Sequence, residues 1–121
     1  MDLGRKISSG KYHARRKKRL HEKQGQQKVV TLSETKRKIL RVRGRNTKTF
    51  LLRANTANLI INGKAKKTKI INVLETPQNR FFARQNRLMK GAIIETEDGK
   101  ARITNRPSQE GQVNAVLLKE K

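Results

Sequence analysis

The sequence predicts an all-β protein, in which a small six- to seven-stranded barrel-like domain follows a basic extended N-terminal arm. The chain has 121 residues, which is the size of one domain. Large apolar side chains are scarce before residue 29 and frequent from Ile39 to Leu118. In that second part, short apolar or β-branched runs alternate with turn residues, as is typical of small barrels and sandwiches.

The arm is predicted to span residues 1–36 and the barrel-like domain residues 37–121. Residues 1–28 contain too little apolar surface to offset the entropy lost on ordering, so the arm should be disordered when free and ordered on a partner. The stretch 11–23 could become helical once a partner neutralises its charges. Domain and arm are separated by a change in composition rather than by a Gly-, Ser- or Pro-rich linker.

The first expected strand runs from Lys38 to Arg43, where apolar and basic residues alternate. Alternation places Leu40 and Val42 on one face and Arg41 and Arg43 on the other. Further strands are expected at 49–52, 59–61, 69–74, 92–96, 101–104 and 113–118.

Turn chemistry separates these strands, for example at Asn62-Gly63 and at Asp98-Gly99. The Asp98-Gly99 pair tolerates the positive φ angles of a type I′ turn, so 92–97 and 100–105 should pair as a hairpin. Residues 79–86 fit a single helical turn as well as a strand.

The charge of the chain restricts its partners. It contains 31 Lys and Arg against 9 Asp and Glu, a formal net charge of +22. Such a chain repels itself when compact and needs a polyanion, of which nucleic acid is the first expectation. Cysteine is absent, which excludes disulfides, thiolate metal sites and a cysteine nucleophile. The sequence has neither an apolar run of membrane-spanning length nor a secretory leader, so an intracellular protein with no membrane partner is expected.

The basic run of the arm is the strongest chemical signal. Closely spaced cations release the counterions condensed on a phosphate backbone, which gives tight, salt-dependent binding. Tyr12 and His13 could stack on unpaired bases or could simply fill space near phosphates. The candidate RNA-binding residues of the arm are Arg5, Lys6, Lys11, Tyr12, His13, Arg15, Arg16, Lys17, Lys18, Arg19 and Lys23.

Further basic clusters occur in the domain. With only 3% aromatic residues the chain lacks a stacking platform, so recognition of the phosphate backbone is expected rather than reading of bases. The candidate RNA-binding residues of the domain are Arg41, Arg43, Arg45, Lys48, Lys64, Lys66, Lys67, Lys69, Arg84, Arg87 and Arg106.

Signals for catalysis are weak. Glu95 and Glu97 would share a strand face, but basic residues of the adjoining strand make them cross-strand charge partners rather than a catalytic pair. His13 and His21 lack a third metal ligand, and the Gly-Lys pairs lack the Ser or Thr of a phosphate-binding loop. We expect no enzyme activity, cofactor, metal or small-molecule substrate.

Several blocks of the sequence, in order, resemble the eight-e family of small-subunit ribosomal proteins of archaea and eukaryotes, in its short archaeal form. The long insertion of the eukaryotic relatives is absent. The matching blocks are 9–11 with 14–19, 41–46, 67–73, 79–84, 90–96 (KGAIIET) and 105–117, which contains RPSQEGQVNAVL. The resemblance implies a structural constituent of the small ribosomal subunit, with a barrel-like body and a basic extension reaching into RNA. It also implies small-subunit ribosomal RNA and neighbouring small-subunit ribosomal proteins as partners, and a cytoplasmic location in ribosomes.

Three other functions of basic β proteins can be compared with the sequence. A coat of double-stranded DNA would bind duplex DNA as well as structured RNA. A cationic membrane-surface peptide would need a large apolar face, which the arm lacks. An RNA-modifying enzyme would need an acid–base pair, for which the sequence offers no good candidate.

Overall fold

The computed structural model describes residues 4–13 and 15–118, which form eight strands, one α-helix and two 3-10 turns. The strands are β1 (Thr31–Leu32), β2 (Lys36–Arg41), β3 (Thr47–Ala54), β4 (Thr56–Ile61), β5 (Lys64–Glu75), β6 (Ile93–Thr96), β7 (Gly99–Ile103) and β8 (Asn114–Leu117). The helix α1 is Arg80–Arg84, and the 3-10 turns are η1 (Leu20–Glu22) and η2 (Arg43–Arg45).

Five strands, β4 to β8, form a closed barrel in which each strand pairs with the next. Successive neighbours run antiparallel, so the first and last of five strands point the same way and must close the barrel as a parallel pair. The register of β4 with β8, Leu59 opposite Ala115, is parallel. The all-β, barrel-like fold class is therefore confirmed, with eight strands in two sheets in place of the six or seven expected.

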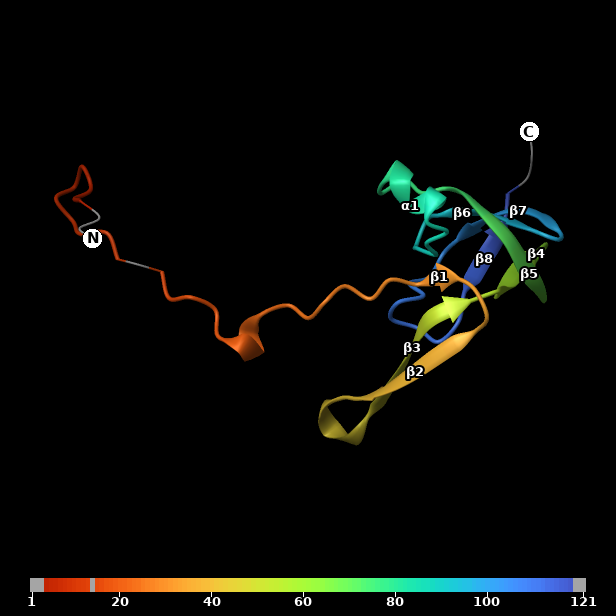
Figure 1. Cartoon of the computed structure of the whole chain (residues 1–121), viewed down its shortest axis with the longest axis horizontal. Helices are drawn as coiled ribbons and strands as arrows, with labels where there is room; N and C mark the ends of the chain where they lie inside the picture. Colours follow the sequence, from red (N-terminus) through yellow and green to blue (C-terminus); the bar gives the residue numbers. More distant parts are fainter. Residues whose placement is uncertain (1–3, 14, 119–121) are drawn as a thin grey trace.

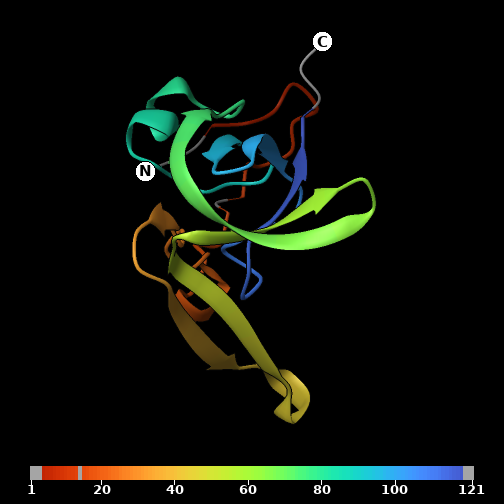
Figure 2. The same ribbon diagram turned by 90° about the vertical axis from the view of Figure 1, so that its right-hand side faces the viewer.

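The long strand β5 shapes one wall of the barrel. Its first half pairs with β4 and its second half with β6, and the register to β6 shifts twice, between Ile70 and Asn72 and between Val73 and Glu75. Such irregularities bend and twist a strand. Figure 2 shows β5, in green, curving around the other barrel strands.

The three-stranded sheet β1-β3-β2 packs against the barrel, and the two sheets share one apolar core. Leu51 of β3 is 1% exposed and belongs to the same cluster as Leu59 and Ile94 of the barrel. The backbone N–H of Leu51 donates to the carbonyl of Pro107 at 3.1 Å. In Figure 1 the β2–β3 hairpin projects beyond this shared core.

Two features of the three-stranded sheet differ from the prediction. Strand β2 ends at Arg41 and does not reach Arg43, so these two arginines do not share a strand face. The cause is the turn that follows, in which Gly44 and Arg45 adopt left-handed φ angles of 73° and 60°. Val42 is exposed and lies outside the strand. Strand β1 was not predicted, because a strand of two residues is too short to show an alternation of apolar and polar side chains.

The β6–β7 hairpin pairs as predicted, with Glu95 opposite Lys100, but its turn is not type I′. The two loop residues are Glu97 and Asp98, while Gly99 already pairs with Thr96. Only Gly99, at 121°, has a positive φ in this hairpin. The Thr96 hydroxyl donates to the Gly99 carbonyl at 2.7 Å, which fixes the turn one residue earlier than predicted.

Three further local predictions can also be compared with the structure. Asn62 and Gly63 form the two-residue turn between β4 and β5, with φ angles of 47° and 81°. The ambiguous stretch 79–86 contains the single helical turn α1. The N–H of Phe81, the second residue of the helix, donates to the Asn79 side chain at 2.9 Å. Within 11–23, the described residues contain one 3-10 turn, η1, and no α-helix.

The arm extends away from the folded body, as the red and orange segment of Figure 1 shows. The described residues between 4 and 29 are all exposed, and Val30 is the first buried residue, 2% exposed. The Leu88 N–H donates to the Val30 carbonyl at 2.9 Å, which attaches the root of the arm to the domain. The division of the chain at residue 36 stays a prediction. No helix within residues 4–13 and 15–118 is long and apolar enough to cross a membrane.

Gly111 is required for contact between the 105–112 loop and strand β3. A Cβ at this position would lie 2.8 Å from Cγ2 of Thr49, and the branched Thr side chain cannot easily rotate away. We therefore expect Gly111→Ala to lower the free energy of unfolding by about 1–3 kcal/mol in a denaturant titration. Thr49→Ser removes Cγ2 and should restore most of the loss. Equal stabilities of Gly111→Ala and the parent chain would contradict the close contact.

Candidate nucleic-acid interface

The first part of the arm forms a small basic loop. Arg5 and Lys11 form an antiparallel bridge, and the N–H of Lys6 donates to the Gly10 carbonyl at 2.9 Å. The ammonium of Lys6 lies 5.6 Å from the ring centroid of Tyr12, a cation–π contact. Tyr12 is 51% exposed and His13 is exposed, so both rings face solvent. Of the predicted residues, the structure brings Arg5, Lys6, Lys11 and Tyr12 together here.

The basic run 15–19 has no regular secondary structure and leads into the 3-10 turn η1. Every residue of the run is exposed. Glu22 receives a hydrogen bond from the Arg16 guanidinium at 2.6 Å and one from the Arg19 N–H at 2.9 Å. These two bonds, that from Arg16 first, lower the pKa of Glu22 below its ordinary value. Glu22 thus caps the turn and fixes where the run ends, at the cost of neutralising one of its cations.

The lowered pKa of Glu22 gives a pH-dependent turn. Because the pKa falls when the turn forms, the Arg16 contact stabilises the turn above the ordinary carboxyl pKa and is lost as pH falls through the lowered value. In an NMR titration of the full chain, Arg16→Ala should raise the midpoint of the Glu22 carboxyl, whereas Arg15→Ala should leave it unchanged. An unaltered midpoint in Arg16→Ala would contradict the Arg16–Glu22 ion pair as the cause of the lowered pKa.

The β2–β3 hairpin presents a second set of cations. Arg41 is the last residue of β2, and Arg43 and Arg45 lie in η2 at the hairpin tip. The loop is closed by a hydrogen bond from the Val42 N–H to the Asn46 carbonyl at 2.8 Å. Lys48, on β3, donates to the Gln109 side chain, so it also connects the hairpin to the 105–112 loop.

The β4–β5 hairpin carries the predicted lysines at and after its turn. Lys66 donates to Asp98 of the β6–β7 turn at 2.6 Å, so part of its charge is used within the protein. Lys67 points to the other strand face and lines a small cavity of about 140 Å³ together with Arg37 of β2. The cavity therefore joins the basic surfaces of the two hairpins. Lys64 and Lys69 are exposed.

The two hairpins form one acid-free stretch of sequence. Between residues 35 and 74 the chain has twelve Lys and Arg and no Asp or Glu. All twelve of these side chains are exposed in the structure. Within this stretch the folded chain keeps its cations at the surface, where a polyanion can reach them.

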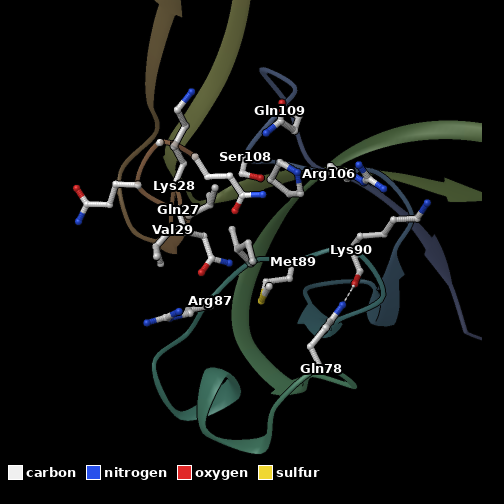
Figure 3. A pocket seen from close by; sticks show the side chains of 16 residues that line it. Gln27, Lys28, Val29, Gln78, Arg87, Met89, Lys90, Arg106, Ser108 and Gln109 are labelled. Atoms are coloured by element: carbon white, nitrogen blue, oxygen red, sulfur yellow. Dashed lines mark hydrogen bonds between the residues drawn. The ribbon is translucent and has the colours of Figure 1, made fainter. Parts of the chain in front are cut away.

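The sequence contains a third basic group, Arg80, Arg84, Arg87 and Lys90, and the structure divides it between helix α1 and a cavity that Arg106 also lines. Arg87 and Arg106 line a cavity of about 680 Å³, whereas Arg84 lies on α1 with its guanidinium 5.9 Å from the Phe81 ring centroid. Figure 3 shows Lys90 and Arg106 on one side of the cavity and Lys28 and Arg87 on the other.

The prediction from sequence omitted several cations that share these surfaces. Lys36 to Lys38 and Arg53 belong to the acid-free stretch, which a count of acids along the sequence would have detected. The third group was predicted without Lys28, which comes to the cavity from the arm; no sequence pattern places it there. The omitted cations are Lys28, Lys36, Arg37, Lys38 and Arg53.

The acidic residues of the β6–β7 hairpin do not gather into a carboxylate pair. Glu95 lies on β6, but Glu97 is in the turn, so the two do not share a strand face as predicted. Their separation follows from the early turn at Glu97-Asp98. In residues 4–13 and 15–118, no three His, Cys, Asp or Glu side chains are grouped closely enough to hold a metal ion.

The fold and its surface define a class of protein: a small basic all-β domain with a closed barrel and a cationic arm, whose charge suits a polyanion. The chain belongs to the ribosomal protein S8e family, whose model matches residues 2–118. The resemblance to the eight-e family is thereby confirmed.

Curated archaeal relatives agree with this assignment. Each of the three that follow is a small ribosomal subunit protein eS8. The chain is 45% identical to that of Staphylothermus marinus over 118 residues, which cover 94% of this chain and 91% of that protein. It is 46% identical to that of Methanococcus aeolicus over 121 residues, covering 96% and 93% respectively. It is 44% identical to that of Nanoarchaeum equitans over 116 residues, covering 93% and 91%.

Proposed function

We propose that this chain is a structural constituent of the small ribosomal subunit, in cytoplasmic ribosomes, and that it scaffolds small-subunit ribosomal RNA through phosphate contacts. The observation that carries the proposal is the acid-free stretch 35–74, whose twelve cations are all exposed on two neighbouring hairpins. Membership of the S8e family supports the ribosomal setting. The proposed role involves binding and no chemical reaction.

The arm supplies contacts that the domain alone would not reach. It is exposed from Gly4 to Val29 at every described position, and its run 15–19 has no regular secondary structure. Apart from Arg16, none of these five side chains is engaged in a hydrogen bond or ion pair among the described residues. In this proposal the arm lies between RNA helices, and its cations screen the repulsion of phosphates that come close together.

The hairpins fix where the arm enters the RNA. The hairpin tip with Arg43 and Arg45 projects from the shared core and reaches outward, while Lys67 and Lys69 line the outer face of β5. Because contacts to phosphates position a protein without reading sequence, this surface would recognise the shape of folded RNA. Neighbouring small-subunit proteins would contact the remaining, less basic surface.

Sedimentation tests the proposal directly. Native lysate is separated on a sucrose gradient in moderate and in high salt, and the fractions are probed for this chain. We expect co-migration with the small subunit that survives the salt wash. Recovery in the free or chromatin fractions would contradict the ribosomal role, and a chromatin position would favour a coat of double-stranded DNA.

A further inference from the structure

The largest cavity described above lies where the root of the arm meets the domain. Its walls come from 24–30, Gln78, 87–90 and 106–109, and its volume is about 680 Å³. This volume lies in the range of pockets that hold a small organic ligand, roughly 300–1,000 Å³. The phosphate contacts proposed above require only exposed cations. They therefore do not account for a cavity of this size.

The charge of the cavity selects an anion. Among the described residues, four cations and no acid line it. Lys28 and Arg87 lie against aromatic rings, with Nζ 3.7 Å from the Phe50 centroid and Cζ 4.4 Å from the Phe82 centroid. Lys90 and Arg106, in contrast, make no side-chain ion pair or hydrogen bond within the described part of the chain. These two remain available for a phosphate.

The rest of the lining is apolar surface combined with amides. Val30 and Leu88 are each 2% exposed, and the hydrogen bond between their backbones holds this wall in place. Met89 lies in the middle of the residues drawn in Figure 3, and its thioether offers a soft, polarisable surface. The side chains of Gln26 and Gln27 form no hydrogen bonds within the described residues, and each amide can both donate and accept.

We propose that this cavity binds one unpaired nucleotide of the RNA strand that follows the arm. The base packs against Met89, its edge bonds to the Gln26 and Gln27 amides, and its phosphate lies between Lys90 and Arg106. A bare phosphate would leave the apolar wall and the amides unused, and a hydrocarbon ligand would leave the cations unused. The proposal rests on the RNA-binding function proposed above and adds a specific subsite to it.

The test uses the full chain and a fluorescent RNA probe. The probe is a short RNA duplex with one bulged 2-aminopurine nucleotide, compared with the same duplex fully paired. We expect the bulged duplex to bind about tenfold more tightly, which corresponds to about 1.4 kcal/mol at 25 °C. The fluorescence of the bulged base should change on binding, as its surroundings change.

Variants that keep the net charge distinguish binding of a nucleotide in the cavity from the general electrostatic attraction of the protein to the RNA backbone. Gln27→Leu removes an amide and Ser108→Leu fills part of the cavity. Gln85→Leu, at an exposed position directly after α1 and outside the cavity, is the matched control. The first two should abolish the preference for the bulge and leave binding of the paired duplex within about twofold. Retention of the preference in both would overturn the subsite.

The remaining outcomes distinguish the two proposals. Equal binding of both duplexes by the parent chain would refute the subsite and leave the RNA-binding function intact. Binding of neither duplex would refute both. Adenosine monophosphate, tested alone, should not bind measurably, because it lacks the neighbouring phosphates that the arm and hairpins hold. Binding of this mononucleotide as tight as that of the bulged duplex would show a site for a free nucleotide and would overturn the assignment to an RNA strand.

Discussion

A variant with alanine at all five positions 15–19 should bind structured RNA at least about 100-fold more weakly than the parent chain at moderate salt. Each phosphate contact that is lost lowers the slope of log affinity against log salt by about 0.7–0.9, so the slope should fall by up to about 4. The barrel should be unaffected, since the run is exposed and contributes nothing to the apolar core. Filter binding over a range of salt concentrations measures both quantities.

A second variant tests whether RNA binding depends on the charge of the run 15–19 or on the identity of its residues. Lysine at all five positions keeps the charge of the run but loses the forked guanidinium of Arg16 that binds Glu22. This variant should retain nearly the whole salt slope. If instead the alanine variant kept the slope of the parent chain, the run 15–19 would have no part in RNA binding, and the other cations of the chain would carry it.

Local chemistry explains the parts of the fold that the sequence predicts well. Asn62-Gly63 forms its turn because both residues tolerate positive φ, a preference that needs no tertiary support. Asn79 caps α1 through its own side chain, which selects the helical alternative for 79–86. The strand periods in the domain are likewise local, and they produce the expected succession of strands.

Features that depend on distant contacts are harder to predict from a single sequence. The Asp98-Gly99 pair is a good type I′ signal, yet the Thr96 hydroxyl and the distant Lys66 support a turn one residue earlier. Strand β1 exists because Thr31 and Leu32 meet β3 about twenty residues later in the chain. Closure of the barrel by β4 and β8 joins residues more than fifty positions apart.

The same distinction applies to the candidate site. The abundance of exposed cations follows from composition, because burying unpaired charge is too costly. Their grouping does not follow from composition. Arg87 and Arg106 meet Lys28 only because the root of the arm, the loop after α1 and the loop before β8 converge on one cavity.

The closing strand of the barrel offers the sharpest test of the fold itself. Leu59, fully buried on β4, contacts the core that both sheets share, whereas its neighbour Ile60 points outward and is 40% exposed. Leu59→Ala leaves a cavity in the shared apolar core and should lower the free energy of unfolding by about 2–5 kcal/mol. Ile60→Ala, in the same strand with nearly the same loss of volume, should cost less than about 1 kcal/mol.

Denaturant titrations of the two variants measure this difference, which depends on the barrel being closed. In an open sheet β4 would be an edge strand, its inner face would be partly exposed, and the two substitutions would have similar costs. In the closed barrel Leu59 is fully buried in the core and Ile60 is 40% exposed, so the loss at Leu59 should exceed the loss at Ile60 by several-fold. Equal losses would contradict the parallel pairing of β4 with β8, and with it the geometry that presents the basic hairpins and holds the root of the arm.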